Sequence, residues 1–148
     1  LVSDLHTHIH IAFDLKPPTL LKVFDKADAW RKPERFAQLL EDDPEVIKWM
    51  KPAPGQFRIE YRNGRNYEPD FVVETADACL LVEPKRADQM TQAEVQTKAR
   101  AALRWCGHAN THAAAHGGKR WHYLLVPDTA IQLGRRIATL FAEFEWQE

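Results

Sequence analysis

One short stretch, residues 79–82, is apolar at every position and limits the possible folds more than any other feature. A strand with one polar face alternates in sequence, whereas a strand covered on both faces reads as a continuous apolar run. We therefore expect a central strand here, in a sheet with helices on both faces. Because proline cannot donate a hydrogen bond to a sheet ladder, we expect regular pairing to fail near Pro84.

Proline and acidic residues mark the expected helix starts. Pro33 suits the first position of a helix, and Glu34 suits its positive end. Asp43-Pro44-Glu45 repeats this signal, so we expect a second helical stretch that packs Val46, Ile47 and Met50 inward. Further helices are expected over residues 95–106, with 108–118 as a frayed tail and loop, and from Asp128 or Thr129 onward.

Three strands are expected before the long helix and one after it. Residues 57–62 alternate in polarity, and Asn63-Gly64 is a strong hairpin signal. The strands at 57–62, 67–75 and 79–82 can form an antiparallel meander. The strand at 121–126 is reached through a helix, so it should pair in parallel. We predict an α/β fold, a mixed four-stranded sheet flanked by helices, in a single domain over residues 1–148.

The composition is that of an ordinary globular domain. The 148 residues are 45% hydrophobic and carry a net charge of −1, so the chain has a sizeable core and no global basic field. Cys79 and Cys106 lie in apolar contexts, which indicates reduced core residues in a cytosolic protein, and no apolar run reaches membrane-spanning length. Because the chain begins at Leu1, we expect a piece of a larger protein.

Acidic and basic side chains meet at one end of the expected sheet. Glu83 and Lys85 project to the same side because side chains alternate along a strand, and Asp70 starts a neighbouring strand. Buried carboxylates need a cation or an ion pair, and their oxygens suit Mg²⁺. We therefore predict a site for metal-assisted phosphodiester hydrolysis. The structural alternative is a solvated turn aspartate and a simple Glu–Lys pair.

Pro69-Asp70 and Glu83-Pro84-Lys85 resemble the two motif elements of the PD-(D/E)XK nuclease superfamily. More narrowly, the stretches YEPDF, LLVEPK, KARAALRWC and WHYLLVP, in that order, resemble the C-terminal endonuclease domain of type III restriction enzyme helicase subunits. The resemblance implies a restriction-endonuclease-like core and a Mg²⁺-dependent DNA endonuclease, with Mn²⁺ as a substitute. It also implies that helicase or translocase and DNA-recognition parts belong to the parent protein.

The resemblance gives each site residue a role. Asp70 and Glu83 would ligate Mg²⁺, and Glu34 would hold a second metal or a metal-bound water. Lys85 would orient the attacking water and stabilise negative charge at phosphorus. The residues expected to contact the DNA backbone are Gln96, Lys98, Arg58 and Arg62.

Other readings stay open. Glu45 and Glu60 compete with Glu34 for the third acidic position. The same fold would also suit a catalytically inactive module that holds DNA or a partner protein. The segment DLHTH at residues 4–8 resembles the opening strand motif of amidohydrolase and PHP-type metal hydrolases, which would bind Zn²⁺ or Mn²⁺ through His6 and His8. A further conceivable metal cluster has helical spacing and comprises His108, His112 and His116.

Overall fold

The computed structural model describes the backbone of residues 32–148 and the side chains from Arg35 onward. The elements follow in the order α3 (Lys32–Asp42), β1 (Val46–Met50), β2 (Ile59–Arg62), β3 (Arg65–Tyr67), β4 (Phe71–Thr75), β5 (Ala78–Lys85), η1 (Ala87–Gln89), α4 (Ala93–His116), β6 (Arg120–Pro127), η2 (Asp128–Ala130) and α5 (Ile137–Phe144). Within this part of the chain, no helix combines the length and apolar character needed to span a membrane.

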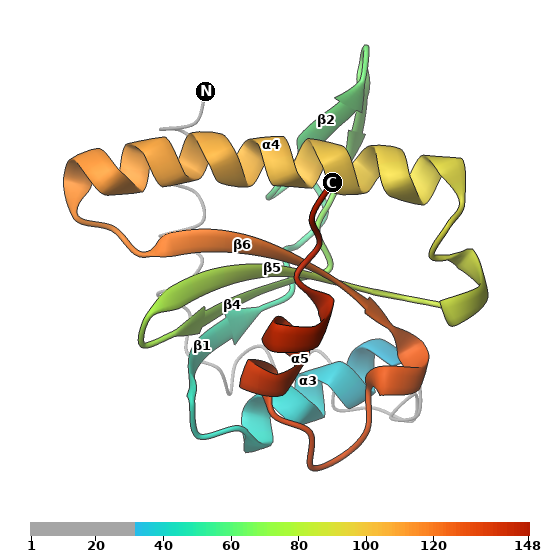
Figure 1. Ribbon diagram of the computed structural model, residues 1–148, viewed down its shortest axis with the longest axis vertical. Helices are drawn as coiled ribbons and strands as arrows, with labels where there is room; N and C mark the ends of the chain where they lie inside the picture. The colour runs from blue at the N-terminus through green and yellow to red at the C-terminus, as the bar shows by residue number, and fades with distance from the viewer. Residues whose placement is uncertain (1–31) are drawn as a thin grey trace.

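Four strands form one mixed sheet in the order β1-β4-β5-β6. β4 is antiparallel to both β1 and β5, and β6 is parallel to β5. The long helix α4 connects β5 to β6 and lies over one face, while α3 and α5 lie on the other face (Figure 1). The predicted α/β class, with a mixed four-stranded sheet flanked by helices, is confirmed.

The core lies on both sides of β5, as its apolar run predicts. Residues 79–82 are buried, with β4 and β6 on either side. On the α3 face, the rings of Phe36 and Phe71 meet edge to face with centroids 4.9 Å apart. On the α4 face, Trp105 and Trp121 make the same kind of contact at 5.0 Å. Aromatic pairs of this geometry add to the stabilisation that apolar burial provides.

Pairing does not fail at Pro84, contrary to the prediction. The parallel register with β6 continues through Pro84 and Lys85, whereas the antiparallel register with β4 ends at Val82. Pro84 therefore lies where β5 has a partner on one side only. A strand tolerates a missing N–H there, because no ladder bond on the open side is lost.

Residues 46–50 form the strand β1, and the helix predicted there is wrong. Trp49 and Met50 pair with Val73 and Val72 of β4 and are buried against it. Asp43 does cap a helix, but that helix is α5. Its carboxylate accepts a hydrogen bond from the amide of Ile137 at the start of α5. Tertiary packing thus overrides the local helix signal.

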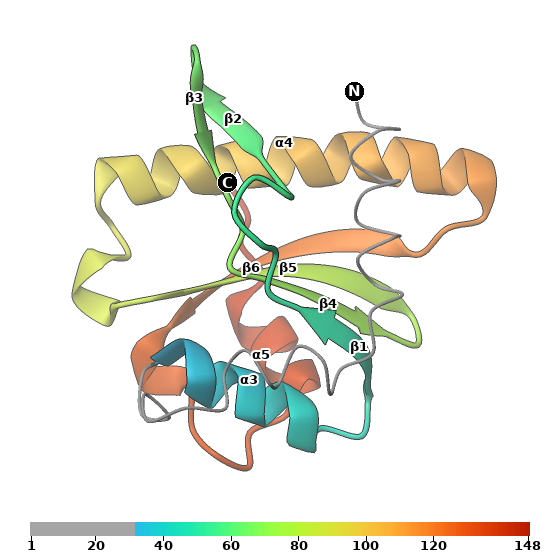
Figure 2. The same ribbon diagram turned by 180° about the vertical axis from the view of Figure 1, so that it is seen from behind.

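The strand predicted at 57–62 does not join the main sheet. β2 pairs only with β3, across the Asn63-Gly64 turn, and forms a separate two-stranded sheet. This hairpin stands beside the N-terminal half of α4 and extends beyond it (Figure 2). The place in the main sheet that was predicted for this strand is taken by β1.

Two helix boundaries also differ from prediction. α4 continues to His116 and ends at Gly117, whose φ of 72° is the left-handed conformation that glycine adopts easily. The segment expected to fray is helical because Ala109 and Ala113 are buried. α5 begins only at Ile137, and Leu133, which falls within the helix expected from Asp128 or Thr129 onward, is 70% exposed in the preceding loop.

Candidate functional site

Asp70 and Glu83 lie side by side at one end of the sheet. The register pairs Phe71 with Val82, so the residues just beyond them, Asp70 and Glu83, are neighbours across β4 and β5. The backbone N–H of Asp70 donates a hydrogen bond of 3.3 Å to Oε2 of Glu83. The sheet therefore brings together two acidic residues that are 13 positions apart in sequence.

Both carboxyl groups are held in an environment that disfavours their charge. Burial raises the pKa of Glu83 to about 8, and the neighbouring charge of Asp70 adds to the shift. Burial also raises the pKa of Asp70, against the opposing effect of nearby lysines. Two adjacent carboxylates repel each other, so the pair is costly to ionise in the absence of a cation.

Three lysines surround this pair, each from a different element. Lys51 follows β1, Lys85 ends β5, and Lys98 lies in the second turn of α4. All three favour the ionised form of Asp70, with Lys51 the strongest, while Lys85 and Lys98 favour the ionised form of Glu83. The site therefore combines two acidic groups with three lysines whose charges act on them, a pattern suited to a cation and an anion bound together.

The interior side of the pair contains two tyrosines that sequence reasoning missed. Burial raises the pKa of Tyr67 and of Tyr123, and the charges of Glu83 and Asp70 raise both further, so the phenols stay neutral. The Tyr67 hydroxyl is buried and has no hydrogen-bond partner among the residues that the structure describes. Aromatic residues in strands normally indicate core, so the sequence carries no signal of this proximity.

The third acidic position is not filled by either competing residue. Glu45 is exposed near Thr75, at the opposite end of β4 from Asp70. Oε1 of Glu60 accepts a hydrogen bond of 2.9 Å from the N–H of Gly64, so this side chain closes the β2–β3 turn. Glu34 belongs to α3, but its side chain lies outside the described residues.

The two carboxyl groups suit a hard cation that keeps part of its own hydration shell. Among the side chains that the structure describes, no three His, Cys, Asp or Glu residues come together to hold a metal ion. Asp70 and Glu83 alone supply two carboxylates, which is the number that Mg²⁺ commonly takes from protein when water and phosphate complete its octahedron. The chemistry of the pair therefore suits Mg²⁺ with an external phosphate.

The residues predicted to contact DNA are divided between α4 and the hairpin. Gln96 contacts the loop that precedes α4, because its Nε2 donates a hydrogen bond of 2.7 Å to the Met90 carbonyl. Lys98 lies 5.1 Å from the centroid of the Tyr61 ring and so borders both the hairpin and the carboxylate pair. Exposed cations on or beside β2 are Arg58, 3.8 Å from Glu68, and Arg62, 5.9 Å from the Tyr61 ring.

The histidine readings gain no support from the described residues. His6 and His8 lie outside them. His112, half-buried, and His116, exposed, stack on α4 with ring centroids 4.1 Å apart, and a nitrogen of the His116 ring lies 2.9 Å from the His112 carbonyl oxygen. His108 is exposed on the same helix, and no metal-holding group includes these side chains in residues 35–148.

Part of the chain has a curated relative. Over 85 residues, 57% of this chain and 19% of the relative, the sequence is 60% identical to the Multifunctional CCA protein of Tolumonas auensis (strain DSM 9187 / NBRC 110442 / TA 4). The match thus spans about a fifth of that relative's length. No family model matches the chain, and no solved structure matches it.

This likeness corrects one prediction. The relative is named for CCA and not for the cleavage of DNA, so it points to a different activity, and the assignment of the chain as a Mg²⁺-dependent endodeoxyribonuclease is wrong. The physical reason is that the motif is not specific for cleavage. Two carboxylates and a lysine can hold a cation against a phosphate without any bond being broken.

Proposed function

We propose that this domain binds the phosphate backbone of a nucleic acid, without cutting it, at the end of the sheet where Asp70 and Glu83 meet. The observation that carries the proposal is the pairing of two partly buried carboxyl groups with three lysines, Lys51, Lys85 and Lys98. Such a pair is unfavourable as it stands. It becomes favourable when a divalent cation neutralises the acids and a phosphate neutralises the lysines.

Mg²⁺ is the cation that this donor set suits best. Asp70 and Glu83 would hold it through their carboxylate oxygens, and the bound ion would supply a positive charge that attracts a phosphate oxygen. Lys85, on the same strand as Glu83, would contact that phosphate directly. Mn²⁺ has the same preference for oxygen ligands and would substitute.

The hairpin extends this surface. Arg62 and Arg65 stand opposite each other across β2 and β3, and both are exposed. Like charges at paired strand positions repel each other, so a phosphate between them would relieve a local cost. Arg58 would add a further contact along the strand. Contacts of this kind hold a backbone in place without selecting a base sequence.

The resemblance to PD-(D/E)XK proteins supports the same proposal at the level of fold. It favours a restriction-endonuclease-like core and DNA as the bound strand. From the same resemblance, we also propose that the parent protein contains a helicase or translocase.

The name of the partial relative favours a second candidate ligand. The 60% identity to a Multifunctional CCA protein suggests RNA that carries a CCA triplet. RNA and DNA share the phosphate chemistry that the site would bind. A single-stranded RNA ending in CCA, compared with the same RNA ending in GGU and with a DNA strand, therefore separates the two candidates.

Fluorescence anisotropy with labelled DNA and RNA strands, with and without Mg²⁺, tests the proposal. We expect Lys85→Met to weaken binding roughly tenfold and to lower the salt dependence by about one unit of slope. Asp70→Asn should remove the Mg²⁺ enhancement while leaving metal-free binding unchanged or stronger, because one negative charge is lost.

Arg120→Met is the matched control. Arg120 is exposed at the start of β6, beside Ala78 and at the opposite end of the sheet from Glu83. It should change binding little. Equal losses for Lys85→Met and Arg120→Met would contradict the proposed site, and Mg²⁺-dependent nicking of plasmid that Asp70→Asn abolishes would contradict binding without cleavage.

A further inference from the structure

A hollow of about 380 Å³ lies at the other end of the sheet from Asp70 and Glu83. Its walls come from the start of β1, the turn between β4 and β5, and α5. The walls include Ile47, Leu80, Ile137 and Phe141. This volume is within the range of sites that hold small ligands or side chains.

The floor of the hollow is apolar, and some residues of its lining have small side chains. Leu80 and Ile137 are fully buried beneath it, whereas Ile47 is 51% exposed at its border. An exposed isoleucine beside an apolar recess is surface that a bound apolar group would cover. Ala76 and Ala138 leave the recess open, because larger side chains at these positions would fill it.

The charged groups that line the hollow are all acidic. Glu45 precedes β1 and Asp77 lies in the turn between β4 and β5, and both residues are exposed. No Lys, Arg or His belongs to the lining within the described part of the chain. Arg136 is next to Ile137 in sequence, but its guanidinium lies 3.5 Å from the buried carboxylate of Asp43. Lys119 also approaches the lining, where its Nζ donates to the Thr75 carbonyl, and it is paired with Glu74. The rim therefore presents the two carboxylates of Glu45 and Asp77 around an apolar centre.

We propose that this hollow binds a peptide segment of a partner protein in which one large apolar side chain is flanked by lysine or arginine. The apolar side chain would enter between Ile47 and Phe141. The basic residues on either side would meet Glu45 and Asp77. This charge complementarity selects basic peptides over acidic ones.

The contact is small, so the interaction is weak and transient. A single buried side chain and two exposed ion pairs correspond to a dissociation constant on the order of 1–10 mM. The hollow shares no lining residue with the carboxylate site, so either proposal can fail without the other.

Peptide titration monitored by the NMR amide shifts of residues 45–47 and 76–78 tests the inference. The probe is a capped Lys-Lys-Phe-Lys-Lys peptide, compared with Glu-Glu-Phe-Glu-Glu and with hexylamine. We expect saturable shifts at these amides with the basic peptide alone. Equal binding of the acidic peptide, or equal binding of hexylamine, would overturn the proposal.

Two variants sharpen the test. Ala138→Trp should fill the hollow and abolish binding, whereas Ala142→Trp, at an exposed position of α5 outside the lining, should leave it unchanged. The double charge reversal Glu45→Lys with Asp77→Lys should exchange the preference, so that the acidic peptide now binds. Retention of the basic-peptide preference in that variant would overturn the proposal even if Ala138→Trp failed to fold.

Discussion

The carboxylate of Asp43 accepts a hydrogen bond of 2.7 Å from the backbone N–H of Ile137, a residue 94 positions later in the chain. Its other oxygen accepts a hydrogen bond of 2.9 Å from the N–H of Glu45 and lies 3.5 Å from Nη1 of Arg136. Asp43 thus caps the first turn of α5 and also shapes the turn into β1. The first unpaired amide of a helix is a favourable place for a carboxylate.

We predict that Asp43→Ala destabilises the fold by about 2–3 kcal/mol, because the buried amide of Ile137 and the part-buried amide of Glu45 lose their acceptor. Urea unfolding of the variant and the wild type measures the difference. Asp42→Ala is the control: Asp42 is exposed and accepts a hydrogen bond from Gln38 on the same helix. A loss for Asp43→Ala no larger than for Asp42→Ala would show that the cap carries little of the stability.

The carboxylate pair predicts a specific dependence of stability on pH. The pKa of Glu83 is raised in the folded state to about 8 from an ordinary value of 4.5, so the folded protein binds its proton more tightly than the unfolded chain. Stability contributed by this group is therefore present below pH 4.5 and declines as the pH rises toward 8. In metal-free buffer, we expect this group to lower the unfolding free energy by roughly 4 kcal/mol between pH 5 and pH 9.

Glu83→Gln isolates this contribution, because glutamine keeps the acceptor for the Asp70 amide and has no charge. The variant should lose most of the decline and be more stable than the wild type at pH 9. Glu60→Gln, at an exposed hairpin position, should keep the wild-type slope. Parallel pH profiles for wild type and Glu83→Gln would contradict the electrostatic description of the pair.

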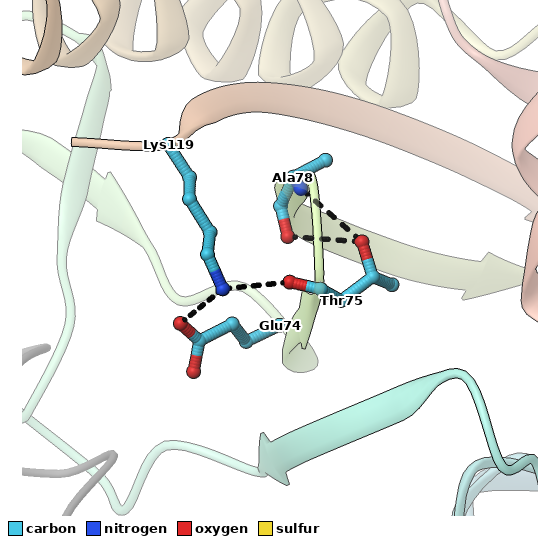
Figure 3. A network of polar contacts seen from close by, with 4 residues as sticks. All are labelled: Glu74, Thr75, Ala78 and Lys119. Carbon is cyan, nitrogen blue, oxygen red and sulfur yellow. Dashed lines mark hydrogen bonds and ion pairs between the residues drawn. The ribbon is translucent and has the colours of Figure 1, made fainter. Parts of the chain in front are cut away.

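Lys119 ties the end of α4 to the far end of the sheet. Its Nζ donates to Oε1 of Glu74 at 2.9 Å and to the Thr75 carbonyl at 2.8 Å (Figure 3). The Thr75 hydroxyl in turn accepts from the N–H of Ala78 and donates to the Ala78 carbonyl. We expect Lys119→Met to cost about 1–2 kcal/mol, since a partly buried carboxylate and a carbonyl both lose a charged donor. Thermal unfolding against the exposed neighbour variant Arg120→Met measures it, and equal melting temperatures would show that the tie is not stabilising.

The sheet could be predicted as far as local pattern reflects tertiary burial. The continuous apolar run at 79–82 identified β5 because burial on both faces leaves no polar position. The segment 46–50 could not be assigned from the same kind of pattern. Its start signal, Asp43, serves α5, a helix whose position depends on the folded core, and sequence spacing alone contains no trace of that contact.

The candidate site could also be predicted only as far as it depends on local pattern. Asp70 and Glu83 were placed together because antiparallel pairing of two consecutive strands is a short-range relation. The effect of Lys51 on Asp70 could not be predicted, since it follows from the position of β1, which had been assigned as a helix. The proximity of Tyr67 and Tyr123 to the acids depends on packing across elements and has no sequence signal.

Capture of a cation by the Asp70–Glu83 pair is tested most directly by an NMR titration with Mg²⁺. The Asp70 amide donates to Glu83 and reports on that carboxylate, while the Gly64 amide donates to the exposed carboxylate of Glu60 in the same way. We predict a large, saturable shift of the Asp70 amide and almost none at Gly64, with both the shift and its saturation lost in Glu83→Gln. Equal small shifts at both amides, linear in Mg²⁺ concentration, would contradict the account.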